Sequence, residues 1–309
     1  MIIALQMDPI ESINVSTDTS FMIGLEAQRR GFQLFCYHPH NLSLSLEGLK
    51  AYGHFIKLYD NPDHYFEKQD PVLFDLKQAD IVWVRQDPPF DLAYITATYL
   101  LDTIASTTLV LNNPKSIRDY PEKLLPFQFQ EFMAPTLISR NIEDFYNFFE
   151  THQDVVLKPL YGAKGHAVIR LKDKENLGGA VDLFQALENT PFIMQKFIPE
   201  VSLGDKRILF VDGDVVGAFK RIPQTGYIRS NIALGGTAEL CDLTLKEQKL
   251  AKVLGPFLKE KGLFLAGIDV IGDYLTEINI TSPTGYVLLN RLNNQKTHEI
   301  IWDKALEKL

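Results

Sequence analysis

Short apolar strands alternate with helical segments through the first 120 residues, and few folds are compatible with this alternation. A helix is predicted over residues 20–30, with Thr17 or Asp18 as its N-terminal cap and Gly31 directly after its end. The strands are nearly uninterrupted apolar runs, which is typical of strands buried on both faces of a parallel sheet. They are predicted at residues 1–7, 32–38, 79–86 and 108–113. We therefore expect an open α/β sheet in this part of the chain.

Charged side chains lie at the carboxyl ends of two predicted strands. Asp8 follows the first strand, and Arg85 and Asp87 lie at the end of the strand over residues 79–86. Ligands of open α/β sheets gather beyond these ends, so we expect a binding site there. No G-x-G-x-x-G motif follows the first strand, and no G-x-x-x-x-G-K-[ST] motif occurs in the chain. The usual dinucleotide and P-loop phosphate sites are therefore excluded.

The composition is that of a globular protein with an acidic balance. Of the 309 residues, 46% are hydrophobic and 23% are charged, and the net charge of −8 argues against a nucleic-acid partner. Cys36 and Cys241 are too few for a disulfide framework and lack zinc spacing. His38 and His40 form an H-x-H pair, which is more often a loop feature than a metal site. No apolar run is long enough to span a bilayer and no signal peptide is evident, so a cytoplasmic protein without a membrane partner is expected.

Beyond residue 121 the pattern changes to hairpins separated by helices. Strands are predicted over residues 155–160, 166–171, 192–198 and, as a hairpin turning at Asp212-Gly213, 206–222. Helices are predicted over residues 176–188 and 245–261, the second capped by Thr244 and ended by Gly262, with one short helix near residue 309. Residues 223–239 are polar and glycine-rich, which predicts a long irregular loop that is either a functional lid or disordered.

Two carboxylates and an amide interrupt the apolar rhythm of residues 267–280. If Gly272-Asp273-Tyr274 forms the turn of a hairpin, Asp269 lies opposite Glu277 and shares one face with Glu277 and Asn279. The other face then carries the apolar side chains Ile268, Val270, Ile278 and Ile280. Close carboxylates without a counter-charge repel each other, and Mg²⁺ prefers such oxygen ligands. The hairpin therefore predicts either a magnesium site or three solvated polar residues on an exposed edge.

Cationic residues cluster in the same half of the chain. Lys158 interrupts an apolar strand, so its ammonium group either meets an anion or faces solvent from an edge strand. Gly162 and Gly165 follow in a tight loop that lets backbone N–H groups approach phosphate oxygens. Further cations are Lys164, Lys196, Lys206, Arg207, Lys220, Arg221 and Arg229. A cationic region beside an acidic metal candidate predicts a site for a metal-bound polyphosphate such as ATP.

Several motifs resemble one family along most of the chain. They are MDPI (7–10), LEAQRRG (25–31), RQDPPFD (85–91), EKL (122–124), LKPL (157–160), GDKRILFVDG (204–213), RIPQ (221–224), GPFLKEKGL (255–263) and GIDVIGDYLTEINITSPT (267–284). With these motifs the chain resembles the bacterial glutathione synthetases, which are ATP-grasp ligases, over residues 1 to about 284. The resemblance implies an ATP-grasp fold of α/β class, preceded by an N-terminal open parallel α/β domain. The expected domains are a substrate-binding domain at 1–120, a small ATP-grasp lid domain at 121–200 and a C-terminal domain with the metal site at 201–309.

The resemblance also implies a reaction and its participants. The enzyme would ligate γ-L-glutamyl-L-cysteine and glycine into glutathione through an acyl phosphate, releasing ADP and phosphate. It would use ATP and Mg²⁺, with Mn²⁺ as an alternative metal, and would assemble as a homotetramer or homodimer. Two alternatives are a related ATP-grasp ligase with another acid or amine, and a nucleotide-binding protein without ligase activity.

Roles for individual residues follow from the same resemblance. Nucleotide contacts are implied for Lys123, Lys158, Gly162, Gly165, Gln195, Lys196, Phe197, Ile198 and, at the ribose, Asp205. Magnesium ligands are implied at Asp269, Glu277 and Asn279, and catalytic roles at Arg207, Arg221 and Asn231. Contacts to the peptide substrate are implied for Asp18, Arg85, Arg229, Ser282 and Thr284.

The chain departs from the family pattern at a few positions. The 162–165 loop carries Lys164 and lacks the family's acidic residue and third glycine, and Ser230 stands where the family prefers glycine. Val287 and Leu288 stand where the family has arginine and then glutamate. Since a guanidinium pairs with a carboxylate through two hydrogen bonds, its loss is expected to weaken recognition of a substrate carboxylate.

Overall fold

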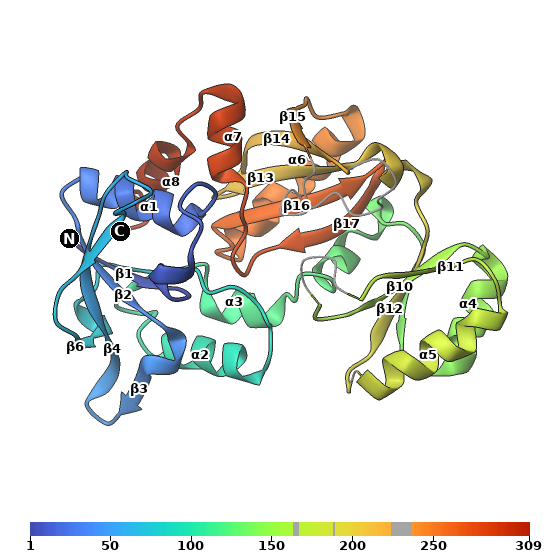
Figure 1. The fold of residues 1–309 in the computed structure, drawn as a ribbon, viewed down its shortest axis with the longest axis horizontal. Coiled ribbons are helices and arrows are strands. Elements are labelled where there is room, and N and C mark those ends of the chain that lie inside the picture. Colours follow the sequence, from blue (N-terminus) through green and yellow to red (C-terminus); the bar gives the residue numbers. More distant parts are fainter. Residues whose placement is uncertain (163–166, 188, 224–236) are drawn as a thin grey trace.

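The computed structural model describes residues 1–162, 167–187, 189–223 and 237–309, which form three sheets (Figure 1). The first sheet contains the predicted parallel strands β1 (Ile2–Gln6), β2 (Gln33–Tyr37), β7 (Ile81–Val84) and β8 (Leu109–Leu111), in the order β2-β1-β7-β8. The predicted open parallel sheet is thereby confirmed.

Residues 42–75 extend this sheet with antiparallel strands that the sequence analysis did not predict. They are β3 (Leu42–Ser45), β4 (Gly48–Leu58), β5 (Phe66–Lys68) and β6 (Val72–Asp75). The strands β3, β5 and β6 each pair with β4. Along β4, buried Leu49 and Ala51 alternate with the more exposed Lys50 and Tyr52. A strand that is buried on one face only lacks the continuous apolar run of the parallel strands, and this one is also interrupted by Gly53.

Helices cover both faces of the first sheet. One face carries α2 (Leu92–Asp102) and α3 (Pro114–Asp119). The other face carries α1 (Thr19–Arg29) together with two helices from the far end of the chain, α7 (Tyr286–Asn293) and α8 (Thr297–Leu306), where one short helix was expected. The indole of Trp302 in α8 donates to the carbonyl of Ile23 in α1 at 2.9 Å. The late helices therefore complete the core of the first domain.

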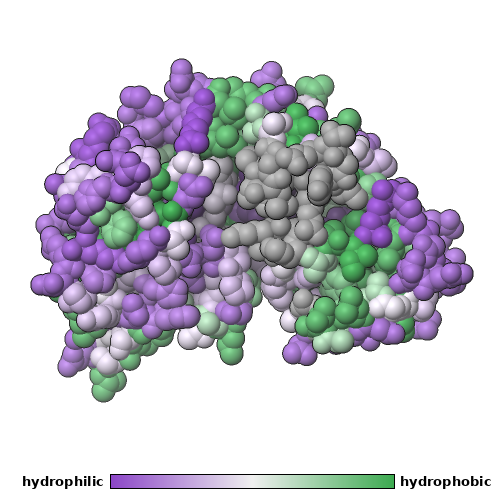
Figure 2. Space-filling view, viewed as in Figure 1, coloured by the Kyte–Doolittle hydropathy of each residue, from purple (hydrophilic) through white to green (hydrophobic). Residues whose placement is uncertain are grey.

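The second sheet forms a small lobe with its own core. Its antiparallel order is β11 (Ile169–Leu171), β10 (Val155–Pro159), β12 (Phe192–Lys196), β9 (Thr136–Ser139), and α4 (Ile142–His152) and α5 (Glu175–Leu187) pack on it. The rings of Phe145 and Phe192 stack at its centre, 4.7 Å apart. Figure 2 shows apolar residues on this lobe, whereas the N-terminal lobe presents a largely hydrophilic surface on the same face. Because β10 is an inner strand, the edge-strand interpretation of Lys158 is wrong.

The third sheet is antiparallel, in the order β15 (Thr237–Leu240), β14 (Asp214–Ile222), β13 (Asp205–Val211), β16 (Leu265–Ile271), β17 (Tyr274–Asn279). A helix, α6 (Leu245–Glu260), packs on it and begins with the predicted cap at Thr244, whose hydroxyl and backbone exchange hydrogen bonds with Glu247. The last three residues of the irregular stretch expected at 223–239 belong to a strand, since β15 begins at Thr237. Residues 224–236 lie outside the described part of the chain. A 3₁₀ helix at Leu125–Phe132 leads into the second sheet.

The hairpin of β16 and β17 has the predicted pairing and an unpredicted bulge. Asp269 lies opposite Glu277, and Ile268, Val270, Ile278 and Ile280 join the core beneath the sheet. The turn is one residue shorter than expected, because Ile271 pairs with Tyr274. A bulge restores the register, and Thr276 is the extra residue in β17.

A buried asparagine connects the first sheet to the third. Asn112 directly follows β8, and its amide nitrogen donates to the carbonyls of Leu265 and Ile280 at 2.8 and 2.7 Å. Its amide oxygen accepts from the backbone nitrogen of Leu265 at 2.8 Å.

No helix in the described part of the chain has the length and apolar character needed to cross a bilayer.

Candidate active site

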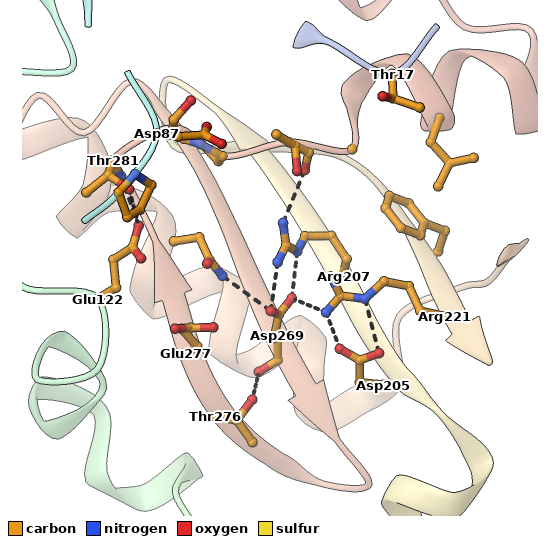
Figure 3. A pocket seen from close by; sticks show the side chains of 18 of the residues that line it. Thr17, Asp87, Glu122, Asp205, Arg207, Arg221, Asp269, Thr276, Glu277 and Thr281 are labelled. Atoms are coloured by element: carbon orange, nitrogen blue, oxygen red, sulfur yellow. Dashed lines mark hydrogen bonds and ion pairs between the residues drawn. The ribbon is translucent and has the colours of Figure 1, made fainter. Parts of the chain in front are cut away.

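A cavity of about 1170 Å³ lies where the three sheets meet. The first sheet contributes the segments after β1 and β7, with Asp8, Arg85 and Asp87. The second sheet contributes Lys158 and the end of β12, and the third contributes the polar face of the β16–β17 hairpin. The expected site beyond the carboxyl ends of β1 and β7 is therefore one wall of a larger cavity, part of which is seen in Figure 3.

The predicted acidic face of the hairpin has counter-charges that the sequence analysis missed. Arg207 holds Asp269 through two hydrogen bonds, Nε to Oδ1 at 2.6 Å and Nη2 to Oδ2 at 2.7 Å (Figure 3). Arg221 lies 3.0 Å from Asp269 Oδ1 and also pairs with Asp205, its partner across β13 and β14. Burial opposes ionisation of Asp269, but the two guanidinium groups outweigh it and keep the pKa of Asp269 well below its usual range.

Lys158, in the second sheet, has a half-buried ammonium group that could pair with an anion. The ammonium of Lys158 donates to Gln195 Oε1 at 3.1 Å, and Gln195 in turn donates to Thr136 Oγ1 at 2.8 Å. Burial lowers the pKa of Lys158 to about 8, and the charge of Lys123 adds to this effect while Glu277 opposes it. Lys123 lies 3.1 Å from Glu277 Oε1 and also donates to the carbonyl of Gly162. A polyphosphate would satisfy this desolvated ammonium.

Glu122 is a site residue that the sequence analysis did not predict. Its Oε1 accepts from the backbone nitrogens of Ile280 and Thr281 at 2.8 and 3.0 Å and from the hydroxyl of Thr281 at 2.8 Å. Burial and the nearby charge of Glu277 raise the pKa of Glu122. Figure 3 shows its carboxylate pointing to Thr281, so Glu122 fixes the segment that follows the acidic hairpin.

The wall from the first domain contains the predicted Asp18 and Arg85. Asp18 caps α1 by accepting from the nitrogen of Phe21 at 2.6 Å, which decides between it and Thr17 as the cap. Burial raises the pKa of Asp18 and lowers the pKa of Arg85. Arg85 donates to Ser20 Oγ at 3.1 Å and to the carbonyl of Pro283 at 3.2 Å.

The predicted substrate residues Ser282 and Thr284 also help to hold the site together. The hydroxyl of Ser282 donates to the carbonyl of Arg85 at 3.1 Å, and the carbonyl of Thr284 accepts from Arg207 Nη1 at 3.2 Å. The turn at 282–284 therefore holds one arginine of the first sheet and one of the third.

The remaining predicted residues divide into those at the cavity and those outside the described part. Lining the cavity are Gln195, Lys196, Phe197, Ile198 and Asp205, and Gly162 lies beside it through its contact with Lys123. Gly165, Arg229 and Asn231, and with them the departures at Lys164 and Ser230, lie outside the described residues.

The hairpin oxygens fit a divalent cation. Among the described residues, Glu277 Oε2 and Asn279 Oδ1 have no hydrogen-bond partner, while Asn279 Nδ2 donates to Gly267 O at 3.1 Å and reaches Asp269 Oδ2 at 3.3 Å. Carboxylate and amide oxygens are the ligands that Mg²⁺ prefers. In the described ranges no three His, Cys, Asp or Glu side chains gather as a metal site, and the candidate set combines two carboxylates with one amide. His38 caps a short 3₁₀ helix at Pro39–Asn41 that contains His40.

Solved structures with the same fold define the class of the protein. The D-cycloserine synthetase DcsG superposes with a TM-score of 0.66 at 15% identity and covers 100% of this chain and 99% of that chain. The ATP-grasp ligase PsnB, complexed with a minimal precursor, gives a TM-score of 0.66 at 13% identity and covers 99% of each chain. At such identities the likeness shows the fold alone. The molecule thus has an ATP-grasp fold with an N-terminal α/β domain, and the predicted fold class is confirmed.

Sequence comparisons narrow this class to one family. The family models for the N-terminal domain and the ATP-grasp domain of prokaryotic glutathione synthetase match residues 1–118 and 122–294. The glutathione synthetase of Rhodopseudomonas palustris is 45% identical over 302 residues, covering 97% of this chain and 96% of its own length. The glutathione synthetase of Bradyrhizobium diazoefficiens is 44% identical over 307 residues, covering 99% of this chain and 98% of its own length. This chain belongs to the prokaryotic glutathione synthetase family. The match runs to residue 294, past the expected end of the resemblance near residue 284.

Proposed function

We infer that this chain is an ATP-dependent ligase that joins γ-L-glutamyl-L-cysteine to glycine, producing glutathione, ADP and phosphate. The observation that carries this conclusion is the match of both glutathione synthetase domains, with relatives of that name aligned over almost the whole chain. ATP, when bound, supplies the phosphoryl group that activates the carboxylate of the dipeptide. The residues of the chain then have to bind charge, orient the reactants and exclude water.

We propose that the nucleotide lies between the second and third sheets. Lys158 and Lys123 are proposed to contact its phosphates, which accounts for a desolvated ammonium group at Lys158. The end of β12, from Gln195 to Ile198, is proposed to line the base. Asp205 is proposed at the ribose, although its carboxylate also pairs with Arg221.

The proposed metal ligands are Asp269, Glu277 and Asn279, with Mg²⁺ as the metal and Mn²⁺ as the alternative. A divalent cation, when bound, offsets phosphate charge during phosphoryl transfer. Arg207 and Arg221 keep Asp269 ionised over the whole physiological pH range, and a bound cation would share the Asp269 oxygens with these two guanidinium groups. The same two guanidinium groups are proposed to offset charge that develops during the reaction.

The peptide substrate is proposed to lie on the side of the cavity formed by the first domain and the 282–284 turn. Asp18, Arg85, Ser282 and Thr284 are the described candidates for its contacts. Arg229, Asn231 and Gly165 stay predictions from the sequence.

The test is phosphate release from ATP and Mg²⁺ with γ-glutamylcysteine, measured with and without glycine. We expect release to require both substrates and glutathione to appear in equal amount. Nucleotide binding without this turnover would mean that the acid or the amine is a different one. In Glu277→Gln, turnover is expected to fall by at least about 100-fold, since one charged metal ligand is lost. Unchanged turnover in this variant would contradict the metal assignment.

We propose in addition that the protein assembles as a homodimer or homotetramer. Exposed apolar side chains on the first domain support this proposal, among them Leu44, Leu46, Leu73 and Tyr99. Light scattering at several protein concentrations tests it, and a monomeric mass throughout would refute it. The cytoplasmic location stays a prediction from the sequence.

A further inference from the structure

The basic residues that line the cavity differ in whether their charge is already engaged. In the described part of the chain they are Arg85, Lys158, Lys196, Arg207, Arg221 and Arg291. Arg207 and Arg221 are paired with Asp269 and Asp205, and Arg85 is held by Ser20 and Pro283. Among the described residues, the side chains of Lys196 and Arg291 have no hydrogen bond or ion pair. Lys196 ends β12 on the nucleotide side, so Arg291 is the free guanidinium elsewhere in the cavity.

Arg291 lies on α7, away from the acidic hairpin. The helix begins just after Gly285, and with a rise of ~1.5 Å per residue Arg291 is about 9 Å further along its axis. Leu288, one turn earlier, lines the same cavity. Val287 stands where the family resemblance predicts an arginine, and Val287 does not line the described cavity. Arg291, about one turn further along α7, does line it.

The start of α1 lies beside this part of α7. Asn290, the neighbour of Arg291, donates to the sulfur of Met22 at 3.3 Å, and Met22 is one turn into α1 from Asp18. Asp18 and the loop of residues 12–17 before it line the cavity. The same end of the cavity therefore offers the half-buried carboxylate of Asp18, which also caps α1, and an exposed guanidinium.

We propose that Arg291 is a specificity-determining residue that binds the glutamyl α-carboxylate of the dipeptide, with Asp18 facing its α-ammonium group. This inference rests on the proposed function, which supplies a substrate with a zwitterionic end far from its reacting carboxylate. The reacting carboxylate has to lie near Asp269 and Glu277, where phosphoryl transfer is proposed. The opposite end of the dipeptide then extends along α7 toward the one free arginine in the described residues of that wall.

The test compares wild type and Arg291→Gln on two acids, γ-glutamylcysteine and its analogue with an amidated glutamyl α-carboxylate. ATP, Mg²⁺ and glycine are kept saturating, and phosphate release is followed. For wild type, we expect the amide to have a KM about 10-fold or more above that of the acid, as for loss of one charge-assisted hydrogen bond. In Arg291→Gln the KM for the acid rises by a similar factor, the amide is almost unaffected, and kcat and the KM for ATP stay near wild type.

Controls separate this role from a structural one. Lys296→Gln removes a cation just beyond α7 but outside the cavity, and its KM for the dipeptide is expected to be unchanged. Arg291→Lys keeps the charge and should recover part of the affinity. An equal rise in KM for acid and amide would overturn the proposal, as would a rise confined to the KM for glycine. If wild type released no phosphate with γ-glutamylcysteine and glycine, the proposed function itself would fall.

Discussion

Lys158 is a cation that the folded chain holds half-buried within a sheet, and among the described residues its one hydrogen-bond acceptor is the amide oxygen of Gln195 at 3.1 Å. Burial lowers its pKa to about 8 from 10.5, so the protein without nucleotide gives up this proton near pH 8. Phosphates favour the ammonium form, and affinity for a non-hydrolysable ATP analogue should be full below pH 8. Above it, affinity should fall by about tenfold per pH unit. Calorimetric titrations between pH 7 and 9.5 measure this slope.

The matched control is Lys158→Arg, because a guanidinium stays charged throughout this range. Its affinity for the analogue should be independent of pH, whatever its absolute value. The same slope in this variant would show that another group titrates.

Glu122 allows a prediction about stability rather than binding. In Glu122→Ala the backbone nitrogens of Ile280 and Thr281 and the hydroxyl of Thr281 lose their shared acceptor. Buried donors left unpaired cost about 1–3 kcal/mol each, so we expect a loss of about 3 kcal/mol in the free energy of unfolding. Glu122→Gln keeps an acceptor oxygen and should lose about 1 kcal/mol or less. Urea denaturation distinguishes these variants, and equal losses would refute the role given to the carboxylate oxygen.

At the scale of elements, the bulge at Thr276 makes the β16–β17 hairpin more than a regular pair of strands. Leu275 lies in the core, and both Thr276 and Glu277 line the cavity, so the bulge places two successive side chains on one face. The hydroxyl of Thr276 also donates to the carbonyl of Asp269 at 2.9 Å. Removing this residue would leave Asp269 opposite Glu277 in a regular hairpin.

Deletion of Thr276 is therefore expected to preserve the fold and impair the chemistry. The free energy of unfolding should change by about 1 kcal/mol or less, since the core face is unaltered. Turnover should fall by about 10-fold or more, because bulges re-aim neighbouring side chains and Glu277 is the next residue. Urea denaturation and phosphate release measure the two effects. Wild-type turnover in the deletion would show that the bulge has no part in aiming Glu277.

The elements that could be predicted are those whose signal is local. The pairing of Asp269 with Glu277 followed from apolar alternation around a Gly-Asp turn, and the cap at Thr244 from a threonine directly before the helical segment. The bulge had no such signal, because it depends on a turn one residue shorter than expected. Strand β4 was missed since only one of its faces is buried.

The site itself depends on contacts that sequence spacing does not encode. Arg207 precedes Asp269 by 62 residues, and only the pairing of β13 with β16 brings them together. The sequence predicted both residues but not that one neutralises the other. Glu122 reaches Thr281 across 159 residues, and its place in the EKL motif did not indicate this contact.

At the scale of the whole molecule, the first and third sheets share one core, whereas the second sheet has its own. Trp302 packs 5.7 Å from Trp83 of the first sheet, measured between ring centroids. Trp302→Ala should lower the free energy of unfolding of the shared core by about 3–5 kcal/mol. Hydrogen exchange should accelerate in α1 and β1 and stay unchanged in α4 and α5. Trp302→Phe keeps an aromatic ring and should lose less of the free energy of unfolding than Trp302→Ala. Hydrogen exchange that accelerates equally in α4 and α5 would contradict the separation of the two cores.

The position of Trp302 also has a consequence for synthesis on the ribosome. The strands of the first sheet and the helices α1, α2 and α3 are complete by residue 119, yet α8, which helps to cover one face of the sheet, ends at residue 306. While nearly two hundred further residues are translated, the apolar side of α1 around Ile23 has no permanent cover. The nascent first domain is therefore expected to expose apolar surface during translation, and its core is complete only when α8 has left the exit tunnel.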